Sequence, residues 1–338
     1  NIDRIGMLIE EEKANDFVSV LSSGHISAIN RAESTVTYQA KIIDKVHNTG
    51  IARNLFLRYV SEAYRKNSTL FNDAMELLFK KAISKKLYYS VSVSEKYSDK
   101  AKVAFENFDK KIESLRRGYE FTKEDGDRLK SKVENISKII PFDDFDKKVK
   151  KEAIVVPTDV NFVSIANKFS KNGEIGRLSL LKTLFNYEYL WTNIRVLGGA
   201  YGCMSFFKRS GNYDFVSYRD PNLKKTNDTF YGIYDYLKNI DMSYDMIEKY
   251  IIGSVGVYDN PASIVDNYKK NVTAYFNGTT NDEIKKERTD LLSMKPSDLK
   301  ELSEVFADIK ESEAVAIICE KDMGEAEKMY DKVWKLSA

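Results

Sequence analysis

Hydrophobic residues recur every three or four positions along most of this sequence, which is the spacing of one face of an α-helix. The stretch 178–194 has a wide apolar face and predicts a buried helix. The helices that the spacing predicts lie at 1–20, 38–64, 69–84, 97–116, 178–194, 230–237, 243–253, 261–275, 281–293, 296–310 and 325–335.

Short runs rich in β-branched and aromatic residues interrupt the helical spacing and predict strands. Two of them, 200–207 and 213–219, flank a turn that contains Ser-Gly and predict a β-hairpin. Asn222, just after the hairpin, is placed to cap the helix that follows. The other predicted strands lie at 25–37, 87–94, 153–156, 161–168 and 314–319.

A stretch dense in lysine and aspartate, 117–150, separates two groups of elements. We interpret it as a connector with some helix between two domains, the number that a length of 338 residues suggests. A surface excursion of a single domain is the alternative. In 151–338, helices grouped with hairpins predict a complete α+β domain whose helices pack on a mostly antiparallel sheet. The segment 1–116 has few strands for its helices to cover, so we expect an incomplete domain there.

Composition narrows the class of protein. The 53 lysines and arginines against 51 acidic residues leave a net charge of +2, which argues against a nucleic-acid partner. The two cysteines, Cys203 and Cys319, cannot form a disulfide framework and favour a reducing compartment. No apolar run is long enough to span a membrane, and the first residues do not resemble a signal peptide. We therefore expect a globular, cytoplasmic protein with no membrane partner.

Histidine is scarce, and this bears on the chemistry. His25 and His47 are the only two, and neither belongs to a zinc motif such as H-x-x-E-H. No local motif marks a Ser-His-Asp or Cys-His arrangement, and no glycine-rich phosphate loop is present. The sequence thus marks no metal site of its own, and we expect a structural or surface role for His25; the family resemblance described below implies that the catalytic residues also lie outside this chain.

The most unusual stretch is 191–207, WTNIRVLGGAYGCMSFF. Here a predicted helix ends in Arg195, Gly198-Gly199 reverses the chain, and Tyr201 begins a strand. Guanidinium and phenol groups are hydrogen-bond donors that can hold a peptide carbonyl or a developing oxyanion. The structural interpretation is a glycine helix cap with Arg195 at the negative end of the helix dipole. The residues alone leave both interpretations open and favour the structural one.

Three motifs in order carry a resemblance to a known family. They are the R-V-L-G-G-A-Y-G segment that begins at Arg195, the S-Y-R-D-P-N segment at 217–222, and S-G-H with R-A at 23–32. Together they resemble the insulinase/pitrilysin superfamily, and most closely its presequence-protease subfamily. The resemblance covers essentially the whole chain. One departure is Arg-Val-Leu where the family often has Arg-Glu-Lys, which leaves the local charge contacts open.

The resemblance implies a zinc metalloendopeptidase with four related α+β sandwich domains in two halves. The zinc motif and its glutamate base would lie in an N-terminal half, so Zn²⁺ is implied for the complete enzyme only. In the C-terminal half, Arg195 and Tyr201 would bind substrate and stabilise the intermediate, with Gly198 and Gly199 supporting the turn. Segment 1–116 would be the later part of the third domain, 117–150 a connector, and 151–338 the fourth domain.

Two functions from different classes follow. The first is the zinc-free half of a clamshell peptidase that degrades unfolded peptides, with the N-terminal half of the same enzyme and peptides as partners. We expect residues to precede Asn1, because no natural start is evident there. The second is a catalytically inactive binding or scaffold protein of the same fold. A helical interaction module unrelated to peptidases is a weaker third interpretation. For Arg219 and Asp220 we expect a salt bridge at the end of a strand.

Overall fold

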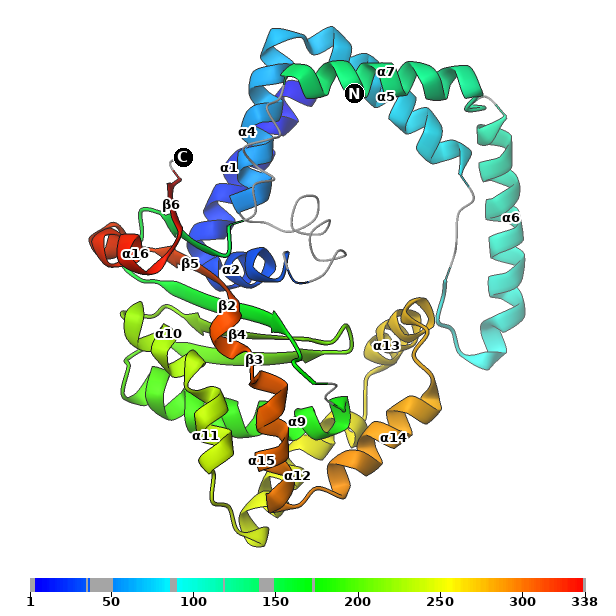
Figure 1. The fold of residues 1–338 in the computed structure, drawn as a ribbon. Helices are drawn as coiled ribbons and strands as arrows, with labels where there is room; N and C mark the ends of the chain where they lie inside the picture. The colour runs from blue at the N-terminus through cyan, green and yellow to red at the C-terminus, as the bar shows by residue number, and fades with distance from the viewer. Residues whose placement is uncertain are drawn as a thin grey trace. The chain divides into compact units, whose positions relative to one another are not determined.

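The computed structural model describes residues 4–34, 36, 51–85, 90–117, 119–139, 149–171 and 174–336 (Figure 1). The chain forms two compact units. Unit 1 comprises residues 1–11, 57–144 and 261–280, and unit 2 comprises 12–56, 145–260 and 281–338.

In its described part, unit 1 is made of helices. Helix α7 packs along α5 through small apolar clusters, in which Ala74 and Leu77 of α5 meet Leu129 of α7. Asp125, at the start of α7, accepts a hydrogen bond from Lys80 of α5 at 2.6 Å. The helices of this unit are the start of α1 (Ile5–Ser22), most of α4 (Ile51–Lys66), α5 (Ser68–Ser84), α6 (Ser98–Arg116), α7 (Lys123–Ile139) and α13 (Ile264–Asn277).

The helices predicted at 1–20, 69–84, 97–116 and 261–275 are therefore confirmed. The stretch interpreted as a connector holds α7, a helix of 17 residues. Of the strand predicted at 87–94, residues 90–94 form no strand, and 87–89 lie outside the described residues. The part of the helix predicted at 38–64 that precedes residue 51 also lies outside the described residues.

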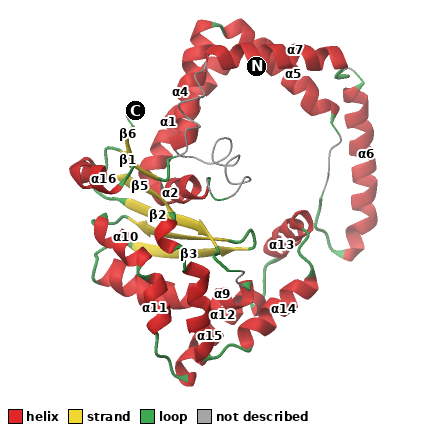
Figure 2. Ribbon diagram, viewed as in Figure 1, coloured by secondary structure: helices red, strands yellow, loops and turns green. Residues whose placement is uncertain are grey.

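Unit 2 is built on one six-stranded sheet with the order β3-β4-β2-β5-β1-β6 (Figure 2). Strands β3, β4, β2 and β5 pair in antiparallel fashion, whereas β1 runs parallel to both β5 and β6. The prediction of an α+β fold with a mostly antiparallel sheet is confirmed. The strands are β1 (Lys151–Val155), β2 (Phe162–Lys168), β3 (Gly202–Lys208), β4 (Asn212–Tyr218), β5 (Glu313–Ile318) and β6 (Lys332–Lys335).

One face of the sheet carries the main helical layer and the larger core. The aromatic ring of Phe185 contacts those of Phe215 and Phe306, with ring centroids 5.7 and 6.0 Å apart. The end of α9 continues through two π-helical turns, Phe185–Tyr189 and Trp191–Val196. The helices of this layer are α9 (Ile175–Leu184), α10 (Lys224–Tyr231), α11 (Ile233–Asn239), α12 (Tyr244–Asp259), α14 (Asn281–Leu292) and α15 (Pro296–Leu302).

The opposite face of the sheet is covered by α2 (Gly24–Glu33) and the end of α1. Ala28 and Ala32 of α2 pack on Phe162 of β2 and Ile317 of β5. The strand predicted at 25–37 is thus wrong: the alternation was weak, and the alanines four positions apart give a helix its buried stripe. Although the sequence groups this segment with 1–116, it belongs to the compact unit of the sheet.

The C-terminal helix predicted at 325–335 is only half right. Helix α16 (Met323–Met329) is followed by strand β6, which pairs with β1 through Val333 and Trp334. That partner lies far away in the sequence, so the helical spacing of the segment could not reveal it. In the part of the chain that the structure describes, no helix is long and apolar enough to cross a membrane.

Candidate functional site

The candidate site is the loop before strand β3. It follows the helix that α9 and the two π-helical turns after it form together. The helix ends where Gly199 adopts a left-handed conformation, with φ of +81°. The N–H of Gly199 donates to the carbonyl of Arg195 at 2.9 Å, and the N–H of Ala200 donates to that of Ile194 at 3.1 Å. These bonds satisfy the last carbonyls of the helix, so the predicted glycine cap is present.

The backbone packs so closely at position 198 that only glycine fits there without a shift. A Cβ atom at this position would lie 2.3 Å from the carbonyl oxygen of Ile194. A Cβ atom on Gly202, where β3 begins, would meet no other atom within 4 Å, so the surroundings of Gly202 are open. Of these two glycines, the first alone is fixed by a close approach of the backbone.

The loop brings Arg195 and Tyr201 together on the surface. The guanidinium of Arg195 lies 4.0 Å from the centroid of the Trp191 ring and 6.0 Å from that of Tyr201. Tyr201 is 67% exposed, and its ring meets that of Tyr218 edge-on at 5.6 Å. The two donors that the sequence singled out are therefore accessible, and aromatic neighbours hold them in place.

The backbone of Tyr201 is anchored to the end of β4. Its N–H donates to the carbonyls of Tyr218 and Arg219, at 3.1 and 3.2 Å. Arg219 has a φ of +49°, which is uncommon for a residue other than glycine. This conformation directs the carbonyl of Arg219 and the chain after it toward the loop.

The segment after β4 differs from its prediction. Among the ion pairs of the described residues none joins Arg219 to Asp220. Asp220 is fully buried and accepts hydrogen bonds from the N–H of Asn222 at 2.9 Å and the hydroxyl of Thr226 at 2.6 Å. Burial raises the pKa of the Asp220 carboxyl, and these hydrogen bonds oppose the rise.

Asn222 does not cap the next helix. The residue before α10 is Leu223, and the side-chain amide of Asn222 instead donates to the carbonyl of Gly198 at 2.6 Å. Asn222 therefore contacts the candidate loop directly. Sequence reasoning missed this role, and also missed that Trp191 holds Arg195. The spacing of four residues between Trp191 and Arg195, one helical turn, was the available signal for the second contact.

A cysteine and a histidine lie near the loop. Burial raises the pKa of the Cys203 thiol to about 12, and the nearby Asp220 adds to the rise. The thiol is therefore protonated at neutral pH and a poor nucleophile. His25 is half-buried with its ring edge-on to Tyr218 at 4.6 Å, and burial lowers its pKa. His47 lies outside the described residues.

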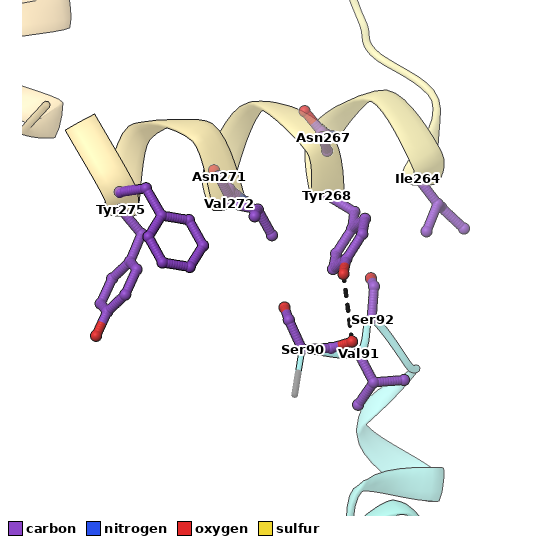
Figure 3. A pocket seen from close by; sticks show the side chains of 10 residues that line it. Ser90, Val91, Ser92, Ile264, Asn267, Tyr268, Asn271, Val272 and Tyr275 are labelled. Carbon is purple, nitrogen blue, oxygen red and sulfur yellow. Dashed lines mark hydrogen bonds between the residues drawn. The ribbon is translucent and has the colours of Figure 1, made fainter. Parts of the chain in front are cut away.

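Pockets are present in the described part of each unit. In unit 2 a pocket of about 640 Å³ is lined by residues that include Pro221, Asn222 and Lys225. In unit 1 a pocket of about 660 Å³ lies between residues 90–92 and helix α13, where the hydroxyl of Tyr268 donates to the carbonyl of Ser90 at 3.2 Å (Figure 3). In the described residues no three His, Cys, Asp or Glu side chains come together in a way that could hold a metal ion.

Comparison with known families identifies the part of the chain that carries the loop. The sequence profile of a family described as PreP C-terminal domain matches residues 151–321. The chain belongs to the PreP C-terminal domain family. Arg195, Tyr201 and Asn222 all lie in the matched region.

Individual proteins also align with this chain. The chain is 27% identical over 322 residues to Protein HypA of Clostridium perfringens, which covers 94% of this chain and 30% of that protein. It is 32% identical over 182 residues to Presequence protease 1, chloroplastic/mitochondrial, of Arabidopsis thaliana, which covers 53% of this chain and 17% of that protein. The chain thus spans less than a third of the length of either relative.

Among solved structures, a peptidase M16 inactive domain from Pseudomonas fluorescens is similar to this chain. The alignment covers 58% of this chain and 50% of the other chain. Its sequence identity is 14% and its TM-score is 0.39.

Proposed function

We propose that this chain is the C-terminal, zinc-free part of a presequence-protease-like metalloendopeptidase that degrades unfolded peptides. In this proposal the loop from Arg195 to Tyr201 contacts the bound peptide opposite a zinc site in the N-terminal half of the enzyme. Family membership supports the first part of the proposal. The single observation that carries the second part is the exposed pairing of the Arg195 guanidinium with the Tyr201 phenol on one glycine turn.

The chemistry of the two side chains suits the task. When zinc is bound in the other half, it polarises the scissile carbonyl and activates a water molecule. The Tyr201 hydroxyl can donate a hydrogen bond to the carbonyl oxygen of the peptide as negative charge develops on that oxygen. The Arg195 guanidinium, held over Trp191, offers a fixed positive charge and several donors to a peptide carbonyl.

The neighbouring side chains also suit an unfolded peptide. Val196 and Leu197 lie on the turn itself and are 63% and 65% exposed. An extended peptide lacks a folded core and so presents apolar side chains for such residues to cover. A loop with apolar residues between two polar donors can therefore contact side chains and backbone of the same peptide.

The proposal is tested by Tyr201→Phe in the full-length enzyme that contains this chain. The loss of one donor to an oxyanion is expected to lower kcat about 10²- to 10³-fold while the zinc content stays unchanged. Tyr244→Phe is the matched control, because Tyr244 is 68% exposed in the same unit but lies at the start of α12. Wild-type turnover of the Tyr201 variant would contradict the role proposed for the loop, whereas a full-length protein with no turnover even with Tyr201 in place would favour the scaffold alternative.

The cellular location stays a prediction. The sequence led us to expect the cytoplasm, whereas the Arabidopsis relative carries chloroplasts and mitochondria in its name. Fractionation of cells that express the full-length protein would distinguish the two compartments.

A further inference from the structure

The turn that carries Arg195 and Tyr201 is tied to the segment after β4 by two side chains. The amide of Asn222 donates to the carbonyl of Gly198 at 2.6 Å, and the ammonium of Lys225 donates to the carbonyl of Leu197 at 2.9 Å. The Gly198 carbonyl belongs to the same peptide group as the Gly199 N–H, which donates to the carbonyl of Arg195. The tip of the turn is therefore held from both sides, by the end of the helix and by the segment after β4.

Asn222 is itself held rigidly. Its N–H donates to Asp220, and the backbone of Asp220 exchanges two hydrogen bonds with Asn161, each of 2.8 Å. Asp220 and Asn161 are both fully buried. The Asn161 side chain accepts from the N–H of Cys319, at the end of β5, at 3.0 Å. A continuous series of hydrogen bonds thus runs from the sheet to Asn222 and on to the Gly198 carbonyl.

The position of this contact gives it a consequence for the site. Gly198 stands between Arg195 and Tyr201, so a rotation of its peptide group changes the distance between the two donors. The backbone at Gly199 is already in the left-handed region, where a single peptide rotation is accommodated at low cost by glycine. The cap bond from the Gly199 N–H to Arg195 holds one end of this peptide group, and the Asn222 amide holds its carbonyl end from outside the helix.

We infer that Asn222 is a positioning residue, whose side-chain amide fixes the Gly198 peptide and thereby the mutual placement of Arg195 and Tyr201. The inference rests on the proposed function. Asn222 does not touch the reacting atoms in this account; it acts through the other two residues. Asp220 orients Asn222, which explains why a carboxylate is buried behind the turn.

The test compares Asn222→Asp with Asn239→Asp in the full-length enzyme. The first replacement preserves shape but puts an acceptor in front of the Gly198 carbonyl, so the contact becomes repulsive. The second is a matched control, because the amide of Asn239 also donates to a backbone carbonyl, that of Asp235 at 2.8 Å, at the end of α11. Asn222→Ala, which removes the donor without adding charge, serves if the aspartate variant does not fold.

The first readout is hydrogen exchange, which does not depend on activity. The amides of Gly199, Ala200 and Tyr201 are expected to exchange about tenfold faster or more in the Asn222 variant, because the turn opens more often. The control variant is expected to leave these three amides unchanged. Unchanged exchange in the Asn222 variants would overturn the inference whatever the enzyme's activity.

The second readout is a double-mutant cycle with Tyr201→Phe. Displacement of a positioned donor by about 1 Å can cost about 10²-fold, so kcat is expected to fall in the Asn222→Asp enzyme by about 10- to 100-fold. In the Tyr201→Phe background the same replacement is expected to have a smaller effect, since the part that acts through the Tyr201 hydroxyl is lost and only the part that acts through Arg195 persists. Equal effects in both backgrounds would show a merely structural role and overturn the inference. If Tyr201→Phe alone has no effect, the proposed function fails, and the exchange measurement still decides the role of Asn222.

Discussion

At the scale of single residues, the sequence revealed the two donors of the site but not what holds them. Arg195, Gly198, Gly199 and Tyr201 are close in the chain, so their turn was predictable from local spacing. Asn222 acts on Gly198 across 24 positions, and its contact depends on the hairpin between them. The sequence suggested a helix cap because asparagine prefers that place, and the tertiary contact overrode the local preference.

Gly198 is the residue whose replacement should have the clearest structural effect. In Gly198→Ala the new methyl group would meet the carbonyl of Ile194 at 2.3 Å, so the backbone must shift. We expect a loss of about 1–3 kcal/mol in the free energy of unfolding, typical of overpacking. Gly202→Ala has open space around it and serves as the control. Urea denaturation measures both, and equal midpoints for the two variants would contradict the close approach at Gly198.

At the scale of secondary-structure elements, the hairpin and the main helices follow from pattern, whereas α2 and β6 do not. The strands β3 and β4 lie on either side of a short turn, so their pairing is local. Packing on the sheet stabilises α2 as a helix, and pairing with β1 stabilises β6 as a strand. Such partners are separated by more than a hundred residues, and a sequence window contains no information about them.

A buried ion pair joins α2 to β1. The guanidinium of Arg31 makes two hydrogen bonds to the Glu152 carboxylate, at 2.8 and 3.0 Å, and Glu152 is 1% exposed. Arg31→Met would leave this carboxylate buried without its partner. We therefore expect the free energy of unfolding to fall by about 3–5 kcal/mol.

The control for that ion pair is Arg288→Met, since Arg288 binds Asp259 with similar geometry but both side chains are more than 40% exposed. We expect it to cost much less, because solvent screens an exposed ion pair. Thermal or urea unfolding measures the difference. A loss in the Arg31 variant no larger than in the control would show that the pair does not secure α2 on the sheet.

The hydrogen bonds at the start of α7 predict that the stability of unit 1 depends on pH. Asp125 accepts hydrogen bonds from Lys80 and from the N–H of Thr122, and these lower the pKa of its carboxyl from 3.8 to about 2. Because the pKa is lower in the folded state, this contribution to stability is present above pH 3.8 and is lost as the pH falls toward 2. The advantage of the wild type over Asp125→Asn should therefore shrink across that interval.

Helix content followed by circular dichroism during urea unfolding, at several pH values, measures this effect. Asp127→Asn is the control, because Asp127 lies on the same helix and is exposed. An advantage of the wild type that stays constant as the pH falls would show that the Asp125 carboxylate is not what stabilises the start of α7.

At the scale of the whole molecule, the family assignment rests on 151–321, the part with strands β1 to β5 and the candidate loop. The motifs that resemble the insulinase/pitrilysin superfamily lie in this part, apart from the S-G-H segment. The division into a third domain, a connector and a fourth domain stays a prediction. The compact units divide the chain differently, because α2 packs on the sheet of unit 2.

The isolated chain is expected to bind no stoichiometric zinc and to hydrolyse no peptide. Its two histidines lie in no zinc motif, and histidine is the usual ligand of catalytic zinc. Metal analysis of the purified chain, together with a peptide-hydrolysis assay, checks this expectation. One tightly bound zinc per chain would contradict it and show that the chain holds a zinc site of its own.

The central claim is that Tyr201 lies against the substrate peptide, and photo-crosslinking tests it most directly. A photoreactive benzophenone amino acid would replace Tyr201 in the full-length enzyme, with Tyr244 replaced in the same way as the control. An unfolded peptide would be added to an enzyme made inactive at its zinc site, and the mixture illuminated. The account predicts a covalent adduct between the peptide and position 201, and none above background at position 244. Equal labelling at the two positions, or none at either, would contradict it.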